Sequence, residues 1–304
     1  MSKSPLQEFP PIVKLLILMG SSLLGLFLMQ MIGLSIMAGL SGKSITEYQY
    51  IFMQPFDFPS MKWDLLFVQA MAALGGFVLM PYAFVRLFEP SFSFGNIPDN
   101  PSVFWIVVML TMAFMVGNSV FIEWNEGIEF PDGFHQIAVQ YEELAKRMTE
   151  FLTAFDSFGY FMVALLVVAV LPAMGEEFLF RGLVQRYFLR SLSNPHMAIW
   201  VAAVLFSAFH MQFFGFVPRM LLGALFGYLY YYSGSLWYSV LAHFINNGLT
   251  LVMLYLYQQH VTDLDLEDSE SVPVYISLIF LVLGFALFVL FYRQFTSKDK
   301  PVNG

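Results

Sequence analysis

Residues 160–182 read YFMVALLVVAVLPAMGEEFLFRG, and this stretch decides how the chain folds. Its first part is apolar, as in a helix that crosses a membrane. Glu176, Glu177 and Arg181 then place charge where such a helix normally carries hydrocarbon. A charge at the centre of a bilayer-spanning helix costs about 2.5–3.5 kcal/mol on insertion scales. Three such groups close together need partners, and they indicate a functional site inside the membrane.

The composition of the whole chain agrees with a membrane location. The chain has 304 residues, of which 58% are hydrophobic and 12% are charged, whereas a soluble domain carries about 25% charged residues. There is no cysteine, which excludes disulfides, thiolate nucleophiles and iron–sulfur clusters. The net charge of -8 argues against nucleic acid as a partner. We therefore expect an all-α polytopic protein whose partner is the lipid bilayer.

Apolar segments of about 18 residues or more indicate membrane spans, and eight spans are predicted along the chain. Between the third and fourth, residues 135–152 are predicted to form an amphipathic surface helix or a solvated loop helix. Residues 41–61 contain Pro55 and Pro59 and are predicted to be a loop. The predicted spans are approximately 15–40, 63–87, 102–121, 158–186, 196–210, 216–232, 236–257 and 274–292.

The chain is divided in sequence order into three regions. Residues 1–157 form an N-terminal transmembrane region, residues 158–260 a core that carries the charged motif and is expected to be the functional part, and residues 261–304 the last loop, the final span and a basic tail. Eight spans place both termini on one side, and more lysine and arginine residues fall on that side than on the other. This bias predicts cytoplasmic termini in a plasma membrane. The residues on the terminal side are Lys3, Lys14, Arg86, Arg186, Arg190, Arg293, Lys298 and Lys300.

Helical geometry divides the charged motif into two parts. Glu177 and Arg181 are four residues apart, so they share a face and are expected to form an ion pair. Glu176 is turned by about 100° from Glu177, and we expect it to face a cavity. Pro172 leaves the carbonyl of Val168 without its helical donor. The helix is therefore expected to be kinked or opened just before the motif, where water would enter.

Two other predicted spans carry polar side chains that complete a candidate site. His210 ends the fifth span, while His243 and Asn247 lie four residues apart on one face of the seventh. Polar groups inside a membrane are expected to face the bundle interior and to find one another. Glu176, His210, His243 and Asn247 are thus expected to converge. An ion-pair cluster that only joins helices, with histidines that only pack, is the structural alternative.

The order of these motifs resembles a known family. Glu-Glu-x-x-x-Arg, then Phe-x-x-x-His, then His-x-x-x-Asn on successive membrane helices is similar to the CAAX-protease and bacteriocin-processing family (CPBP, or Abi) of intramembrane endopeptidases. The resemblance covers about residues 158–257, and the first three spans are outside it. It implies hydrolysis of a peptide bond in a membrane-associated protein or peptide.

The resemblance also implies roles for individual residues. Glu176 would activate a water molecule together with His210, while His243 and Asn247 would stabilise the oxyanion. Glu177 and Arg181 would orient the residues of this site without themselves contacting the substrate. A carboxylate in a poorly solvated pocket is a stronger base than one in water, which is compatible with this chemistry.

The use of a metal is left open by the residues. Glu176, His210 and His243 match the two-histidine, one-carboxylate set of catalytic zinc sites, although the His-Glu-x-x-His signature is absent. Either no cofactor or one divalent metal, with zinc the expected ion, fits the sequence.

Two other functions fit the same buried residues. In a proton-coupled transporter, the glutamate and histidines would relay protons, although no pair of inverted halves is visible. In an immunity or scaffold protein of the membrane, they would have no catalytic role.

Overall fold

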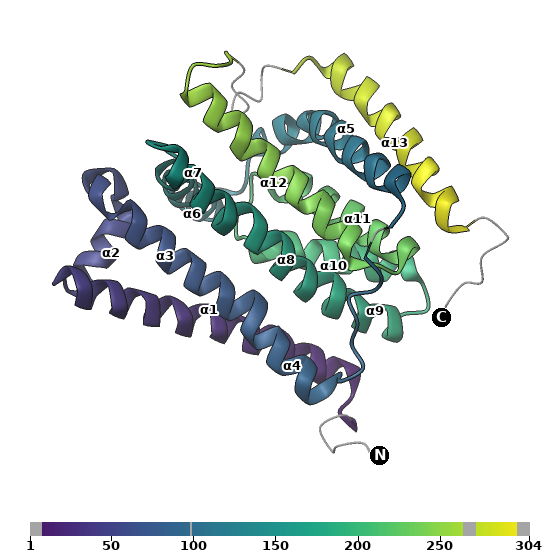
Figure 1. Cartoon of the computed structure of the whole chain (residues 1–304), viewed down its shortest axis with the longest axis horizontal. Coiled ribbons are helices and arrows are strands. Elements are labelled where there is room, and N and C mark those ends of the chain that lie inside the picture. Colours follow the sequence, from purple (N-terminus) through teal and green to yellow (C-terminus); the bar gives the residue numbers. More distant parts are fainter. Residues whose placement is uncertain (1–7, 98, 264–271, 297–304) are drawn as a thin grey trace. The chain divides into compact units, whose positions relative to one another are not determined.

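The computed structural model describes residues 8–97, 99–263 and 272–296. Within these ranges the chain forms helices, turns and loops, with no β-strand (Figure 1). The all-α class predicted from the sequence is confirmed. Much of the predicted last loop and the basic tail, at residues 264–271 and 297–304, lies outside the described residues.

Among the described residues, six helices, rather than the predicted eight, are long and apolar enough to cross a membrane. The fifth predicted span, α10 (Pro195–Phe209), has 15 residues. At 1.5 Å per residue it is only about 22 Å long, which is shorter than the hydrocarbon core of about 30 Å. The sixth, α11 (Phe216–Ser233), is also absent from the six, and it includes Arg219 among its 18 residues. The six are Pro11–Ser41, Pro59–Phe88, Pro101–Glu126, Phe158–Ser191, Leu236–Gln258 and Val274–Thr296.

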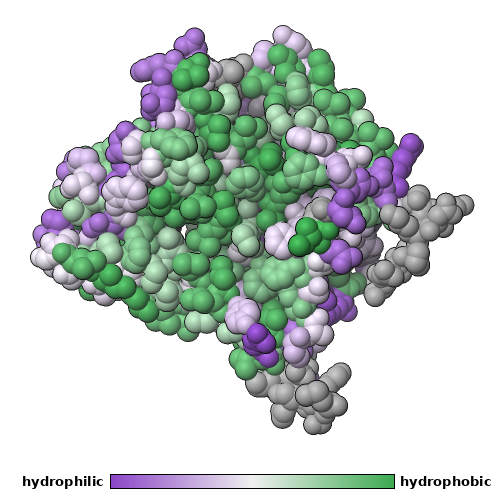
Figure 2. Space-filling model, in the orientation of Figure 1, coloured by the Kyte–Doolittle hydropathy of each residue, from purple (hydrophilic) through white to green (hydrophobic). Residues whose placement is uncertain are grey.

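Apolar side chains remain widely exposed on these helices. Hydrophobic residues dominate the face shown in Figure 2, and Leu16, Val282 and Phe285 are each more than 60% exposed. Large contiguous apolar surfaces are rare on soluble monomers and mark contact with a membrane or a partner. Together with the six apolar helices, they identify an integral membrane protein.

The segments between the spans are more helical than expected. The 41–61 loop contains α2 (Ile45–Met53), which begins with a capping box between Ser44 and Glu47. This correction has a simple cause, because the two prolines end α2 without preventing it from starting. Residues 135–152, predicted to form an amphipathic surface helix or a solvated loop helix, are helical as part of α6 (Asp132–Leu152).

The contacts between residues group the chain into two compact units. The first contains residues 1–93 and 143–193, and the second contains residues 94–142 and 194–304. Each unit thus combines segments from two separate stretches of sequence. These two units are defined by contacts, whereas the three regions predicted from the sequence follow the order of the chain. The division into three regions therefore stays a prediction.

In the first unit, three long helices lie side by side (Figure 1). They are α1 (Pro11–Ser41); the helix formed by α3 (Lys62–Ala73), η4 (Leu74–Leu79) and α4 (Met80–Phe88); and the motif helix, Phe158–Ser191. A side chain at Gly175 would meet Cβ of Phe77 at 2.7 Å. The glycine therefore permits the motif helix to approach η4 closely, as small residues do at membrane helix interfaces.

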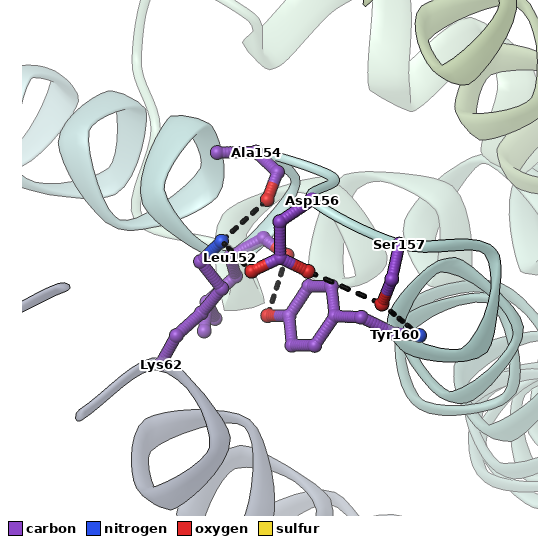
Figure 3. A network of polar contacts seen from close by, with 6 residues as sticks. All are labelled: Lys62, Leu152, Ala154, Asp156, Ser157 and Tyr160. Atoms are coloured by element: carbon purple, nitrogen blue, oxygen red, sulfur yellow. Dashed lines mark hydrogen bonds and ion pairs between the residues drawn. The ribbon is translucent and has the colours of Figure 1, made fainter. Parts of the chain in front are cut away.

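The beginning of the motif helix is held by the polar network in Figure 3. Lys62, at the start of α3, donates to the carbonyl oxygen of Ala154 at 2.6 Å and to Asp156 Oδ2 at 3.3 Å. The same ammonium group lies 4.9 Å from the centre of the Tyr160 ring. The hydroxyl of Tyr160 donates to the carbonyl of Leu152 at 2.9 Å. These contacts fix the turn between α6 and α7 (Phe158–Leu165) against α3.

The second unit is built around α5 (Pro101–Glu126). Helices α11, α12 (Leu236–Gln258) and α13 (Val274–Thr296) all pack on α5, and α10 packs on α11. Ser119 of α5 and Ser277 of α13 share a hydrogen bond of 2.7 Å. One buried cluster of this unit contains Val103, Val107, Leu110, Leu225, Phe226, Leu229, Tyr238, Ala242 and Phe291.

Candidate active site

The acidic motif lies where the motif helix departs from regular α-helical geometry. Leu171 donates its N–H to the carbonyl of Leu166, five residues back, so a π-helical stretch ends just before Pro172. This confirms the expected opening of the helix. A second π-helical stretch, η6 (Phe178–Gln185), follows directly after Glu177. Such irregular turns are frequent at functional sites. The entry of water at this point stays a prediction.

Both glutamates of the motif are buried at the end of α8 (Leu171–Glu177). Glu176 is 7% exposed and Glu177 is fully buried. Arg181 donates to Glu177 Oε1 at 2.7 Å, and the arginine is itself only 1% exposed. The predicted i,i+4 pair between Glu177 and Arg181 is confirmed. A charge-assisted bond of this length holds the helix face rigid around the first glutamate.

His210 directly follows the last residue of α10. Its Nδ1 lies 2.9 Å from the carbonyl oxygen of Phe206. A carbonyl can only accept, so we assign the ring proton to Nδ1, which makes Nε2 the basic nitrogen. This arrangement suits a histidine that accepts a proton or a hydrogen bond through Nε2, and it equally suits a metal ligand.

His243 is held between aromatic rings in the middle of α12. The imidazole is 4% exposed. It stacks on Phe226 with ring centres 5.2 Å apart and meets the edge of Phe206 at 6.0 Å. The Phe206 ring also contacts His210, at 5.1 Å. One phenyl ring therefore brings the two predicted histidines to a common place in the second unit.

Asn247 lies one helical turn after His243 on α12. Its Oδ1 accepts a hydrogen bond of 3.0 Å from Nδ2 of the neighbouring Asn246. Because this contact fixes which end of the amide is the acceptor, the Nδ2 donor of Asn247 points the other way. A donor with a fixed direction is what stabilisation of an oxyanion requires.

The predicted residues fall into two groups, each described within its own unit. Glu176, Glu177 and Arg181 belong to the first unit, and His210, His243 and Asn247 belong to the second. Convergence of all of them at one point stays a prediction. In the described part of the chain, no group of three or more histidine, aspartate or glutamate side chains is placed to hold a metal ion. The proposed zinc set takes members from both units, and it too stays a prediction.

Sequence reasoning missed two amides on α5. Asn118 donates to the carbonyl of Pro218 at 3.2 Å, and Asn125 donates to the carbonyl of Phe213 at 3.1 Å. Phe213 lies in the loop that follows His210, and Pro218 lies in the first turn of α11 after this loop. The available signal was a pair of amides within an apolar span, where polar side chains are expected to have a function.

Comparison with known proteins gives a match to one family model. The model described as "Type II CAAX prenyl endopeptidase Rce1-like" matches residues 158–249, a range that includes all the predicted site residues. An uncharacterized protein of Bacillus subtilis (strain 168), YpbD, is 29% identical over 85 residues, which cover 27% of this chain and 40% of YpbD. No solved structure matches the chain. Residues 158–249 are therefore similar to the Rce1-like type II CAAX prenyl endopeptidases, which supports the resemblance to the CAAX-protease and bacteriocin-processing family, and the chain spans less than half the length of the curated relative that it matches.

Proposed function

We propose that the protein is an intramembrane endopeptidase that hydrolyses a peptide bond of a membrane-associated protein or peptide. The observation that carries the proposal is the match to the Rce1-like model over residues 158–249. That range includes a buried carboxylate, two histidines sharing one aromatic ring, and an oriented amide donor. These are the groups that water-dependent cleavage of an amide needs.

The reaction proceeds in two steps. Glu176 removes a proton from a water molecule, whose oxygen attacks the scissile carbonyl carbon to give a tetrahedral oxyanion. The intermediate then collapses and the carbon–nitrogen bond breaks. The protonated Glu176 returns its proton to the leaving amine, so that a carboxylic acid and an amine are the products. No serine or cysteine nucleophile takes part.

The other site residues assist this hydrolysis through hydrogen bonds from particular atoms. Nε2 of His210 accepts a hydrogen bond from the attacking water and orients it. His243 and the Nδ2 group of Asn247 donate to the oxyanion, where the loss of one preorganised donor typically costs about 10²–10³ in kcat. The buried pair of Glu177 and Arg181 holds the helix face from which Glu176 projects.

A divalent metal remains compatible with this set of residues. Glu176, His210 and His243 have the donor atoms of a catalytic zinc site, and the Nδ1 contact of His210 with a backbone carbonyl is typical of metal-bound histidine. Bound zinc would lower the pKa of a coordinated water to about 7. The roles proposed for Asn247, Glu177 and Arg181 are the same with or without it.

The proposed setting is the cytoplasmic half of the plasma membrane, with both termini in the cytoplasm. The bias of lysine and arginine residues supports this orientation. Six crossings preserve the same-side arrangement of the termini that eight crossings would give, because both numbers are even.

The test is a cleavage assay of the purified protein in liposomes. Quenched fluorogenic peptides with a prenylated CAAX terminus, and the same peptides without the lipid, serve as probes. Glu176→Gln is expected to lower kcat by about 10²–10⁴-fold, the usual effect of losing a general base. Glu143→Gln changes a mostly exposed carboxylate of α6 and serves as the matched control with full activity.

Three results decide between the functions. Loss of cleavage in Glu176→Gln, with an unchanged elution volume and unfolding midpoint, supports the proposal. Full cleavage in Glu176→Gln would sink the mechanism. Proton flux into the liposomes that disappears in Glu176→Gln, with no cleavage of any probe by the wild type, would identify a transporter instead. Metal analysis of the same sample, with and without chelator, distinguishes a metal-dependent peptidase from a metal-free one.

A further inference from the structure

The loop between α10 and α11 begins directly at His210. The N–H of His210 donates to the carbonyl of Ser207 at 3.2 Å, and that of Met211 donates to the carbonyl of Ala208 at 3.1 Å. Met211 then takes a φ of 55°, in the left-handed region that a residue with a side chain rarely adopts. Such a conformation persists only where the surroundings hold it. The direction of the His210 ring thus depends on what fixes this loop.

Asn125, near the end of α5, contacts the loop on both sides. Its Nδ2 donates to the carbonyl of Phe213 at 3.1 Å, and its Oδ1 accepts the N–H of Val217 at 2.7 Å. The residue is 1% exposed. One buried amide therefore uses its donor and its acceptor to join the middle of the loop to the first turn of α11.

Two further side chains hold the same connection. The hydroxyl of Ser207 donates to the carbonyl of Phe216 at 2.6 Å, and Asn118 donates to the carbonyl of Pro218 at 3.2 Å. Asn118 and Asn125 are about two helical turns apart on α5, so both lie on the same face. Amides inside an apolar helix are costly without partners. The hydrogen bonds of Ser207, Asn118 and Asn125 all go to backbone groups within residues 213–218.

We propose that Asn125 is a positioning residue for the reaction, which acts by holding the α10–α11 loop so that His210 keeps its orientation. This rests on the proposed function, in which Nε2 of His210 orients the attacking water. Asn125 lies outside residues 158–249, which match the family model. The third span thus supplies a support that the matched segment does not contain.

The mechanism of this support predicts a specific kinetic signature. Without the two hydrogen bonds of Asn125, which we call the clamp, the α10–α11 loop samples other conformations. The hydrogen bond from His210 Nδ1 to the Phe206 carbonyl is then made for a smaller fraction of the time. Substrate binding is retained because Asn125 does not contact the substrate in this scheme. The variant therefore loses kcat, by about 10- to 100-fold for a displacement of around 1 Å, and keeps its KM within a factor of about three.

Asn125→Asp is the informative variant. The ionised carboxylate keeps an acceptor for the N–H of Val217, but it lacks the donor to Phe213 and turns a second oxygen toward that carbonyl. When protonated, the carboxyl group donates again. The activity of Asn125→Asp relative to the wild type is therefore expected to rise as the pH falls toward 5. A residue that serves only for packing would not give this rescue.

The experiment combines cleavage kinetics with hydrogen exchange on the full-length protein in liposomes. Asn125→Asp and Asn125→Leu are compared with Thr111→Val, which removes another buried polar group of α5. The Thr111 hydroxyl bonds only within its own helix, to the carbonyl of Val107 at 2.8 Å. We expect about tenfold faster exchange of the 211–217 amides and the loss of kcat in both Asn125 variants, with neither change in Thr111→Val. Asn125→Asp preserves size and suffices if Asn125→Leu does not fold.

The outcomes separate the clamp from the proposed function. A cleaving wild type with unchanged kcat in Asn125→Asp, or with unchanged exchange in residues 211–217, overturns the positioning role alone. Equal losses of kcat in Asn125→Asp at every pH also overturn it. A wild type that cleaves no probe overturns the proposed function, and the positioning role with it.

Discussion

Tyr187 donates a hydrogen bond of 2.7 Å to Oε1 of Glu89, a residue 98 positions earlier in the chain. Arg190 donates to Oε2 of the same carboxylate at 3.0 Å, and the ammonium group of Lys14 lies 3.5 Å from Oε1. Glu89 thus ties the end of the motif helix to the end of α4 and to the first turn of α1. With the Lys62 network at its beginning, the motif helix is fixed at both ends.

This carboxylate predicts a loss of stability in acid. Burial alone raises the pKa of Glu89, but the hydrogen bonds from Tyr187 and Arg190, together with the positive charges of Arg190 and Lys14, more than offset this, so its pKa lies below the ordinary value of about 4.3. A pKa lowered by folding contributes stability that is present above the ordinary value and lost as the pH falls through the folded one. Glu89→Gln is therefore expected to unfold at a lower temperature than the wild type at pH 7. The difference should shrink below about pH 4, and a gap that stays constant down to pH 3 would contradict this account.

The buried pair of Glu177 and Arg181 predicts strong coupling between two substitutions. Removing one partner leaves a buried charge, which typically costs about 3–5 kcal/mol. Arg181→Met and Glu177→Met should therefore each lower the unfolding midpoint, whereas the double variant Glu177→Met with Arg181→Met should recover much of the loss. Thermal unfolding of the three proteins in the same detergent gives the coupling. Simple additivity of the two single losses would show that the pair is not a unit.

Asn247 and its neighbour Asn246 provide a matched pair of variants on α12. Asn247→Ala removes the proposed oxyanion donor and is expected to lower kcat by about 10²–10³-fold with little change in stability. Asn246→Ala removes only the group that orients it, through the 3.0 Å bond to Oδ1, and should cost less than tenfold. Steady-state kinetics show which of the two variants loses more kcat. A larger loss in Asn246→Ala than in Asn247→Ala would show that Asn247 is not the oxyanion donor.

Close approach of helices at Gly175 predicts a steric effect. A methyl group there would meet Cβ of Phe77 at 2.7 Å, and overpacking of this kind typically costs about 1–3 kcal/mol. Gly159, in the same helix, has open space around an added Cβ, so Gly159→Ala should be neutral or slightly stabilising. The unfolding midpoints of Gly175→Ala and Gly159→Ala provide the comparison. Equal midpoints would mean that the two helices separate easily.

The sequence was sufficient for features that depend on neighbouring residues. Long apolar runs predicted the six spans, the four-residue spacing predicted the bond between Glu177 and Arg181, and Pro172 predicted the opening of the motif helix. The error in the span count arose because α10 is apolar but short, while α11 is a continuous helix whose apolar residues are mixed with Arg219 and several tyrosines. Helix α2 was missed although Ser44 and Glu47 form a recognisable capping box.

Features that depend on distant residues were not predicted. The contacts of Asn118 and Asn125 with the α10–α11 connection join residues 88–100 positions apart, and no local pattern indicates such partners. The same is true of Glu89 with Tyr187. The grouping of residues 1–93 with 143–193 has no signature in composition either, because all the spans are similarly apolar. Packing between helices, rather than propensity, decides these features.

The interleaving of the two units has a consequence for synthesis. Helix α5 emerges from the ribosome before the distant partners of Asn118, Ser119 and Asn125 exist. Asn125 must wait 88 residues for the carbonyl of Phe213, and Ser119 must wait 158 residues for Ser277. Unsatisfied polar groups are costly in lipid, so α5 must be kept in a polar or protein-lined setting by the insertion machinery until α11 and α13 arrive. A chain that ends before Phe213 therefore leaves the amide of Asn125 without this acceptor.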